Sequence, residues 1–232
     1  MNVILVEPSF PDNQKQFARS LAEVGATVIG IGERSKESLD DDVKGWLTHY
    51  EQVGSVVDEG ALFDAVRRVQ GMVWVDRLEA TVEAHIMPAA RVREACHIPG
   101  TSERTAFLCR DKPAMKEALR AAGVRCAQST GATSAAEVWS FAAQVGYPLI
   151  LKPAAGAGAA GATRVNAADE LAEAISRSGV DHGVAIAVEE YVEGHEGFYD
   201  TISIDGRVAM DFVTHYYPNV LEAMRTRWIS PQ

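Results

Sequence analysis

Short apolar runs alternate with helical patterns along residues 1–104, and this alternation constrains the fold more than any other feature. The first unit has an apolar run at Val3–Val6, a helical pattern at Phe17–Val24 and a second apolar run at Thr27–Ile31. Strands that alternate with helices of this length form a parallel sheet with helices on both faces. We therefore predict an N-terminal α/β domain of Rossmann-like architecture.

The same pattern continues through the rest of this domain. Further strands are predicted at Ser55–Val57 and Met72–Val75, on either side of a helix whose apolar face carries Leu62, Phe63, Val66 and Val69. The first strand-to-helix turn, Glu7–Pro11, contains no glycine. The glycine-rich turn that places a dinucleotide pyrophosphate on the next helix is therefore missing. A doubly wound fold is indicated, but NAD binding is not.

Composition and charge exclude several classes of protein. Of the 232 residues, 47% are hydrophobic and 23% are charged, which is the balance of an ordinary globular protein. Lys and Arg number 22 against 32 Asp and Glu, and the formal net charge of −10 counts against a nucleic-acid or anionic-membrane partner. No apolar run reaches the roughly 18 residues that a membrane span needs.

The start of the chain and the cysteines indicate a compartment. Met1–Glu7 has no basic segment ahead of its apolar run, so it does not read as a signal peptide. Cys96, Cys109 and Cys126 are an odd number without a close pair, which fits a reducing environment. We expect a cytoplasmic protein. The sequence leaves the oligomeric state open, and a homo-oligomer is compatible with it.

A cluster of proline and glycine at His97–Ser102 marks the end of the first domain. We place the two domains at residues 1–104 and 105–232, with a smaller α+β subdomain at about residues 126–187.

Capping residues and a turn define the elements of the second domain. Asp111 caps a helix that Gly123 ends, and Ser134 with Glu137 forms a capping box ahead of the next helix. Residues 197–214 alternate in polarity around an Asp-Gly turn, which is typical of a β-hairpin.

Lys152 ends a buried apolar strand and precedes a loop of alanines and glycines that leads to a partner strand at Thr163–Val165. Backbone N–H groups of such a loop can approach a phosphate closely, and a lysine at the end of a buried run favours an anionic partner. One interpretation is a flap over phosphates, and the other is a linker of small residues. Lys112 is a second candidate for a phosphate contact, with an exposed helix-start lysine as the alternative.

An acidic segment, Glu189–Glu196, follows a predicted buried strand at Val184–Val188. An extended chain at this place can offer an adenine ring one N–H and one C=O, with a carboxylate to accept from the 6-amino group. Glu196 can accept hydrogen bonds from ribose hydroxyls. A solvated acidic turn is the alternative interpretation.

In this order and spacing, the segments resemble the ATP-grasp superfamily, closest to its carbamoyl-phosphate synthase and biotin carboxylase-like members. The resemblance runs from about Asp111 to Asp211 and rests on Asp111-Lys112, Gly146–Pro153, the glycine loop and Val188–Gly194. It implies an α/β chain in which the Rossmann-like domain is followed by a partial ATP-grasp fold, made of a small α+β lid and the start of an antiparallel sheet.

The resemblance also implies two sets of contacts to ATP. The phosphate contacts are Lys112, Lys152 and the loop residues Gly156, Gly158 and Gly161. The adenine and ribose contacts are Glu189 through its carboxylate, Glu190 and Val192 through their backbone, and Glu196 at the ribose.

Family members activate a carboxylate as an acyl phosphate that an amine attacks, so small-molecule carboxylate and amine substrates are implied, with Mg²⁺ in the full-length protein. After Glu196 the sequence shows no metal-ligand spacing, and we nominate no metal ligand and no catalytic residue. We therefore expect the front part of an ATP-dependent carboxylate–amine ligase, without its metal-binding end and with an unprotected sheet edge near Asp211–Val213. A nucleotide-binding module without turnover is the alternative.

Overall fold

The computed structural model describes residues 1–153, 161–218, 220 and 222–223. The chain forms two compact units, Met1–Met115 and Lys116–Gln232, and each is described by itself.

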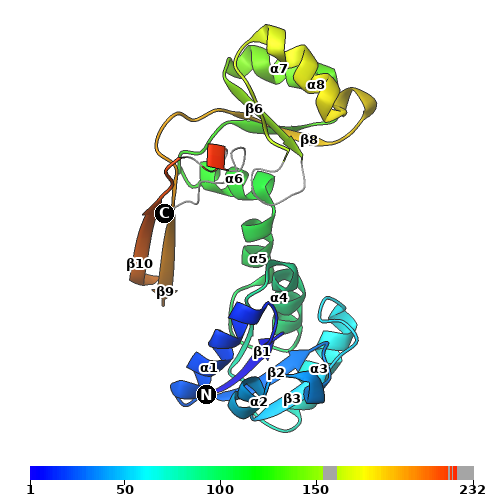
Figure 1. Ribbon diagram of the computed structural model, residues 1–232, viewed down its shortest axis with the longest axis vertical. Coiled ribbons are helices and arrows are strands. Elements are labelled where there is room, and N and C mark those ends of the chain that lie inside the picture. The colour runs from blue at the N-terminus through cyan, green and yellow to red at the C-terminus, as the bar shows by residue number, and fades with distance from the viewer. Residues whose placement is uncertain (154–160, 219, 221, 224–232) are drawn as a thin grey trace. The chain divides into compact units, whose positions relative to one another are not determined.

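The first unit is built on a parallel sheet of four strands (Figure 1). The strands are β1 (Asn2–Val6), β2 (Thr27–Gly32), β3 (His49–Gln52) and β4 (Arg77–Ala80), in the order β3-β2-β1-β4. The helices are α1 (Lys15–Glu23), α2 (Asp41–Trp46), α3 (Glu59–Gln70), α4 (Ile86–Ala95) and α5 (Glu103–Arg110), with short 3₁₀ turns at Asp12–Gln14, Lys36–Ser38 and Glu83–His85.

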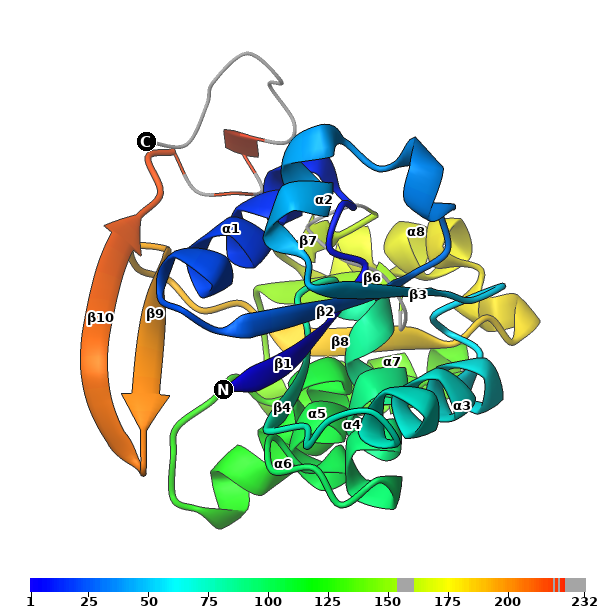
Figure 2. The same ribbon diagram turned by 90° about the horizontal axis from the view of Figure 1, so that it is seen from below.

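Helices cover both faces of this sheet, because neighbouring strand residues point to opposite sides (Figure 2). On one face Ile4 and Ile29 pack against Leu62 and Val66 of α3 and Val92 of α4. On the other face Leu5 and Val28 pack against Ala18 of α1. The doubly wound fold that the sequence predicts is confirmed.

Two strand positions in this unit were predicted wrongly. Ser55–Val57 and Met72–Val75 lie outside the strands, which are found at His49–Gln52 and Arg77–Ala80. Both observed strands are edge strands of the sheet. These two strands, His49–Gln52 and Arg77–Ala80, contain polar as well as apolar residues. The apolar runs Ser55–Val57 and Met72–Val75 therefore look more like buried strands in the sequence.

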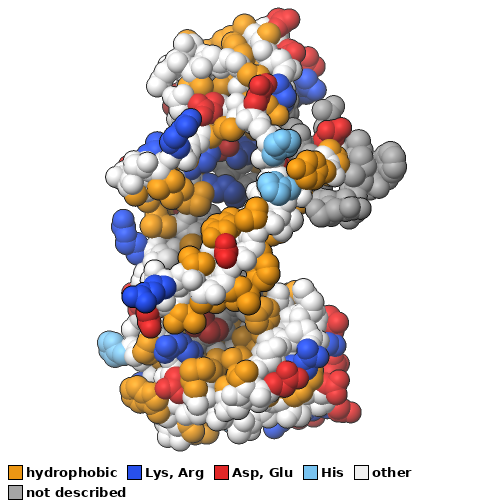
Figure 3. Space-filling model, turned by 90° about the vertical axis from the view of Figure 1, so that its left-hand side faces the viewer, with side chains coloured by type: hydrophobic (Ala, Val, Ile, Leu, Met, Phe, Trp, Pro, Cys, Tyr) orange, Lys and Arg blue, Asp and Glu red, His pale blue; other side chains and the backbone are white. Residues whose placement is uncertain are grey.

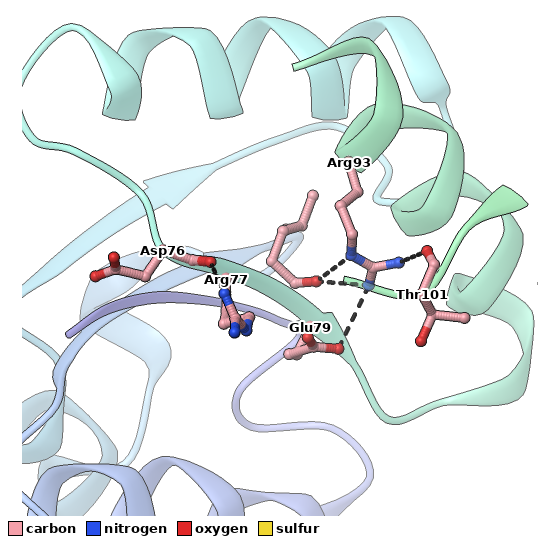
Figure 4. Close-up of polar contacts among 6 residues, drawn as sticks. Asp76, Arg77, Glu79, Arg93 and Thr101 are labelled. Carbon is pink, nitrogen blue, oxygen red and sulfur yellow. Dashed lines mark hydrogen bonds and ion pairs between the residues drawn. The ribbon is translucent and has the colours of Figure 1, made fainter. Parts of the chain in front are cut away.

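A buried arginine fastens α4 to the edge strand β4 (Figure 4). Arg93 is 4% exposed, and its guanidinium donates to the Leu78 carbonyl from Nε (2.9 Å) and Nη2 (2.6 Å). Nη1 donates to the Thr101 carbonyl at 2.7 Å. Gly100 (φ +156°) leaves room for this side chain because glycine has no Cβ, and a Cβ there would lie 2.6 Å from Arg93 Cδ.

The second unit contains an α+β subdomain of four strands and two helices at the place of the predicted lid, and we keep the name lid for it (Figure 1). Its antiparallel sheet has the order β5-β8-β6-β7, from β5 (Ser129–Ala132), β6 (Leu149–Pro153), β7 (Thr163–Val165) and β8 (Ile186–Glu190). The helices are α7 (Ala135–Val145) and α8 (Ala168–Ser178), followed by a 3₁₀ turn at Val180–His182, and α6 (Lys112–Ala121) precedes the lid. The capping box of Ser134 and Glu137 is confirmed, and Asp111 Oδ1 accepts from the Ala114 N–H at 2.8 Å.

An antiparallel hairpin of β9 (Gly197–Ile204) and β10 (Arg207–His215) follows the lid. Its turn residues Asp205 and Gly206 both have positive φ, +49° and +74°, as the Asp-Gly signal predicts. Every residue of β9 is exposed. Among the described residues, no helix is long and apolar enough to cross a membrane.

Candidate functional site

The two faces of the lid sheet differ in character. Leu149 and Leu151 of β6 and Val188 of β8 are buried under α7 and α8, where they pack against Val138, Phe141, Leu171 and Ile175. Residues at the alternate positions, Ile150, Lys152 and Glu189, are therefore on the opposite face. One face of the sheet forms the lid core, and the other carries the polar side chains that the sequence singled out.

Glu189 lies between two lysines on this polar face. Its Oε1 accepts from Lys116 Nζ of α6 at 2.6 Å, and its Oε2 pairs with Lys152 Nζ of β6 at 2.8 Å. The side chains of Glu189 and Lys116 are 14% and 13% exposed, so the pair is largely shielded from water. We call these three residues the lysine–glutamate triad. It brings two cations from separate elements to one place.

The protonation of Glu189 reflects two opposing effects. Burial raises the pKa of its carboxyl, whereas the hydrogen bonds and charges of Lys116 and Lys152 lower it. The two lysines prevail, and the pKa lies below the ordinary value of 4.5. Glu189 is therefore ionised at neutral pH, and the triad carries one net positive charge.

Small and apolar side chains surround the triad on the polar face. Ala187 is in register with Lys152 on one side and with Gly131 on the other, and a Cβ at Gly131 would meet nothing within 4 Å. Ile150 is in register with Glu189. The register partners named here are thus small or apolar residues.

A third cation, Arg164, joins the lid strands to the acidic segment. Arg164 of β7 is in register with Ile150, and its guanidinium lies 3.9 Å from the centroid of the Tyr191 ring. The Tyr191 N–H donates to the Pro148 carbonyl at 3.0 Å. These contacts fix the start of the acidic segment against the strand that carries Lys152.

Two of the residues expected to contact phosphate and adenine, Lys152 and Glu189, are brought together by the structure. Lys112 is the first residue of α6, one helical turn before Lys116. Gly161 is described, with φ +75°. Gly156 and Gly158 lie outside the described residues.

The remaining predicted contacts are occupied by neighbours or exposed. The Glu190 N–H, expected to contact the adenine ring, donates to the Gln128 carbonyl at 3.0 Å, and the Glu190 carboxylate accepts from Gln128 Nε2 at 2.8 Å. Val192 is 64% exposed. Glu196 Oε2 accepts from the Val220 N–H at 2.7 Å. Both carboxylate oxygens of Glu189 pair with lysines. Neither oxygen is therefore free to accept from an adenine amino group, which is the contact that the sequence predicts.

Sequence reasoning missed Lys116. A usable signal was present, since Lys112 and Lys116 are four residues apart on a helix and therefore share a face. The partner of Lys116 lies 73 residues further along the chain, however, and no local pattern connects the two.

Among the described residues, no three His, Cys, Asp or Glu side chains are grouped so that they could hold a metal ion. On the face shown in Figure 3, acidic, basic and apolar side chains of the described residues are interspersed.

A family comparison matches the same part of the chain. Residues 111–197 match the family described as carbamoyl-phosphate synthase L chain, ATP binding domain. This range contains all three residues of the triad.

Individual relatives extend the similarity over most of the chain. The chain is 25% identical over 185 residues to the L-arginine-specific L-amino acid ligase of Bacillus subtilis, covering 77% of this chain and 45% of the relative. The crystal structure of an L-amino acid ligase from Bacillus licheniformis matches with a TM-score of 0.67 and 20% identity, covering 93% of this chain and 50% of that one.

N5-carboxyaminoimidazole synthetase from Staphylococcus aureus, crystallised with ADP, also matches with a TM-score of 0.67, at 17% identity, covering 93% of this chain and 54% of that one. The chain thus spans about half the length of the relatives that it matches.

Proposed function

Because this chain belongs to the ATP-grasp superfamily, we propose that it binds the phosphates of ATP at the lysine–glutamate triad and supplies the nucleotide-binding part of an ATP-dependent carboxylate–amine ligase. The observation that carries the proposal is the convergence of Lys116 and Lys152 on one shielded carboxylate.

The charge balance of the triad supports phosphate binding. Glu189 neutralises one of the two ammonium groups, so the lysines remain ordered and still present one net positive charge. The Coulomb energy of one lysine–phosphate pair at about 4 Å is roughly 4 kcal/mol at an effective dielectric constant near 20. The cost of desolvating the two groups is subtracted from this value. The one net positive charge of the triad therefore favours the binding of a phosphate group at this place.

We assign the remaining contacts to ATP from the resemblance to the ATP-grasp family. We assign Lys112 to the phosphates, as the first residue of the helix that carries Lys116, together with Gly156, Gly158 and Gly161. We assign the adenine and ribose contacts to Glu189, Glu190, Val192 and Glu196. Since Glu189, Glu190 and Glu196 have protein partners in this structure, nucleotide binding at these positions requires an exchange of hydrogen bonds.

We propose amino acids as the carboxylate and amine substrates, because the relative with 77% coverage of this chain is named as an L-amino acid ligase. ATP would activate the carboxylate as an acyl phosphate, and the amine would then displace phosphate. Residues 1–104 would form the domain before the ATP-grasp part and residues 105–232 part of the ATP-grasp domain, with the lid at about 126–187. Mg²⁺ is expected with the nucleotide, and we assign no step to it.

The ligase proposal is tested in the full-length ligase that contains this chain, by measuring ADP release from ATP with pairs of L-amino acids and by detecting the dipeptide by mass spectrometry. We expect ADP and dipeptide in equal amounts, and their loss in Lys152→Met. Glu193→Gln is the control, since Glu193 is exposed and makes only a marginal 4.0 Å pair with Arg164.

A nucleotide-binding module without turnover is a second candidate, favoured by the lack of a metal-ligand group among the described residues. It predicts ADP binding without ADP release for any amino-acid pair, and that result would contradict the ligase proposal.

A further inference from the structure

Arg164, on the polar face of the lid sheet, takes no part in the lysine–glutamate triad. It is the middle residue of β7, the edge strand in the order β5-β8-β6-β7. Arg164 is in register with Ile150 of β6, and Ile150 is in register with Glu189 of β8. Residues in register on neighbouring strands point to the same face, and two strand spacings separate the Arg164 and Glu189 backbones by about 10 Å. Any contact of Arg164 with the chain after β8 must therefore reach across β6.

The Arg164 side chain makes such a contact with Tyr191, the residue that follows β8. The guanidinium carbon lies 3.9 Å from the centroid of the Tyr191 ring, a distance that is typical of a cation–π contact. Glu193 is a weaker partner, because its carboxylate lies 4.0 Å from the guanidinium and its side chain is 81% exposed. The guanidinium is therefore occupied by the acidic segment.

Tyr191 is held through its backbone as well as through its ring. Its N–H donates to the Pro148 carbonyl at 3.0 Å, and the preceding N–H, of Glu190, donates to the Gln128 carbonyl at 3.0 Å. The chain is thus fixed on both sides of the lid sheet up to Tyr191.

The next backbone donor is the N–H of Val192. Among the described residues it has no hydrogen-bond acceptor, and the Val192 side chain is 64% exposed. A backbone N–H that is held in place but has no protein acceptor is available to a ligand. The orientation of this N–H depends on Tyr191, because the two residues share one planar peptide group.

We propose that Arg164 is a positioning residue for the base of the nucleotide: by stacking on Tyr191, it holds the Val192 N–H where an adenine ring can accept its hydrogen bond. This role rests on the proposed function, the binding of ATP by the lid. Arg164 itself contacts neither the base nor the phosphates.

A donor that is already ordered loses less conformational entropy when the ligand binds. That advantage applies only to a base that has an acceptor atom at the edge facing the chain. Adenine has an acceptor nitrogen at N1, whereas hypoxanthine carries a proton on N1. Substitution of Arg164 should therefore change the affinity for an adenine nucleotide and leave the affinity for an inosine nucleotide as it is.

Calorimetric titrations of the whole 232-residue chain with ADP and with inosine diphosphate test this role, because the two ligands share their ribose and phosphates. We expect Arg164→Met to raise the Kd for ADP by about three- to fivefold, the factor that corresponds to a partly exposed cation–π contact. The Kd for inosine diphosphate should not change. An equal rise for both nucleotides, or no rise for ADP, would overturn the proposal.

Further variants separate the stacking contact from a general loss of charge. Arg164→Lys should bind ADP nearly as the unmodified chain does, since an ammonium also lies favourably over an aromatic ring. Tyr191→Leu should raise the Kd for ADP as Arg164→Met does, and the double variant should show no further rise, because both changes remove one contact. Additive effects of the two changes would contradict the proposal.

Arg177→Met is the matched control, because Arg177 is an exposed arginine of α8 that pairs with Glu173 one turn away. It should leave both Kd values unchanged, and matching circular dichroism spectra would show that all variants are folded. Absence of ADP binding to the unmodified chain would overturn the proposed function together with this role. Binding of ADP that Arg164→Met leaves unchanged would overturn the role of Arg164 alone.

Discussion

Glu189 holds two ammonium groups with one carboxylate, and this shared pairing determines how the site responds to substitution. Lys116 is the less exposed of the two lysines, with 13% of its side chain accessible against 27% for Lys152. Ligand phosphate would gain most from the lysine that water screens least.

Lys116→Met is therefore expected to weaken ADP binding by about tenfold or more, because a shielded charge-assisted contact to phosphate is removed while the aliphatic chain is kept. Isothermal titration with ADP measures the change. Glu117→Gln, on the next residue of α6 and exposed, is the control and is expected to bind as the unmodified chain does. Equal affinities in both variants would remove Lys116 from the site.

The lowered pKa of Glu189 also predicts a pH dependence of stability. Because the pKa of the folded state lies below 4.5, the ionised carboxylate stabilises the fold fully above about pH 4.5, and this stabilisation is lost as the pH falls through the folded value. Glu189→Gln should lower the free energy of unfolding by about 1–3 kcal/mol at pH 7.

Urea unfolding of both proteins from pH 7 down to pH 3 checks this expectation. The difference between them should shrink as the pH falls below 4.5. A difference that stays constant across this range would show that the charge of Glu189 does not stabilise the fold.

The candidate site could be predicted from the sequence only in part, and the reason lies in distance along the chain. Lys152 and Glu189 each follow a run of apolar residues, so a charged residue at these positions stands out in the sequence. Lys116 has no such local context, because its partner Glu189 lies 73 residues away along the chain and only the folded structure brings the two together.

Among the secondary-structure elements, those with strong local signals were predicted correctly. The capping box before α7 and the Asp-Gly turn between β9 and β10 both specify backbone geometry within a few residues. The edge strands β3 and β4 have no comparable signal, since their position depends on pairing with β2 and β1. Long-range pairing decides such strands, not local sequence.

At the junction of α4 and β4, Arg93 is expected to be essential for stability. Arg93→Ala would leave the carbonyls of Leu78 and Thr101 without their donor (Figure 4), at a cost of about 2–4 kcal/mol in the free energy of unfolding. Chemical denaturation measures this loss. Arg77→Ala is the control, because Arg77 is exposed and donates only to the neighbouring Asp76 carbonyl. A similar effect of both substitutions would contradict the role given to Arg93.

On the scale of the whole molecule, the β9–β10 hairpin presents a large exposed apolar surface. Ile202 is in register with Met210, and Phe212 is in register with Asp200, so these apolar side chains share one face. Ile202, Met210 and Phe212 are 56%, 51% and 57% exposed. Apolar patches of this kind favour association in water.

The chain of 232 residues, expressed alone, is therefore expected to self-associate. Sedimentation velocity and binding of a hydrophobic dye measure this tendency. The double substitution Ile202→Thr and Phe212→Thr should reduce both signals, whereas Val184→Thr, at an exposed apolar residue outside the hairpin, should not. A monodisperse monomer without dye binding would contradict the expectation.

The central claim is that the lysine–glutamate triad binds nucleotide phosphates, and a calorimetric titration with ADP tests it most directly. We predict saturable binding to the unmodified chain, and binding weaker by about tenfold or more in Lys152→Met, where one phosphate contact is lost. Absence of binding to the unmodified chain, or equal affinity in Lys152→Met when its circular dichroism spectrum shows an intact fold, would contradict the account.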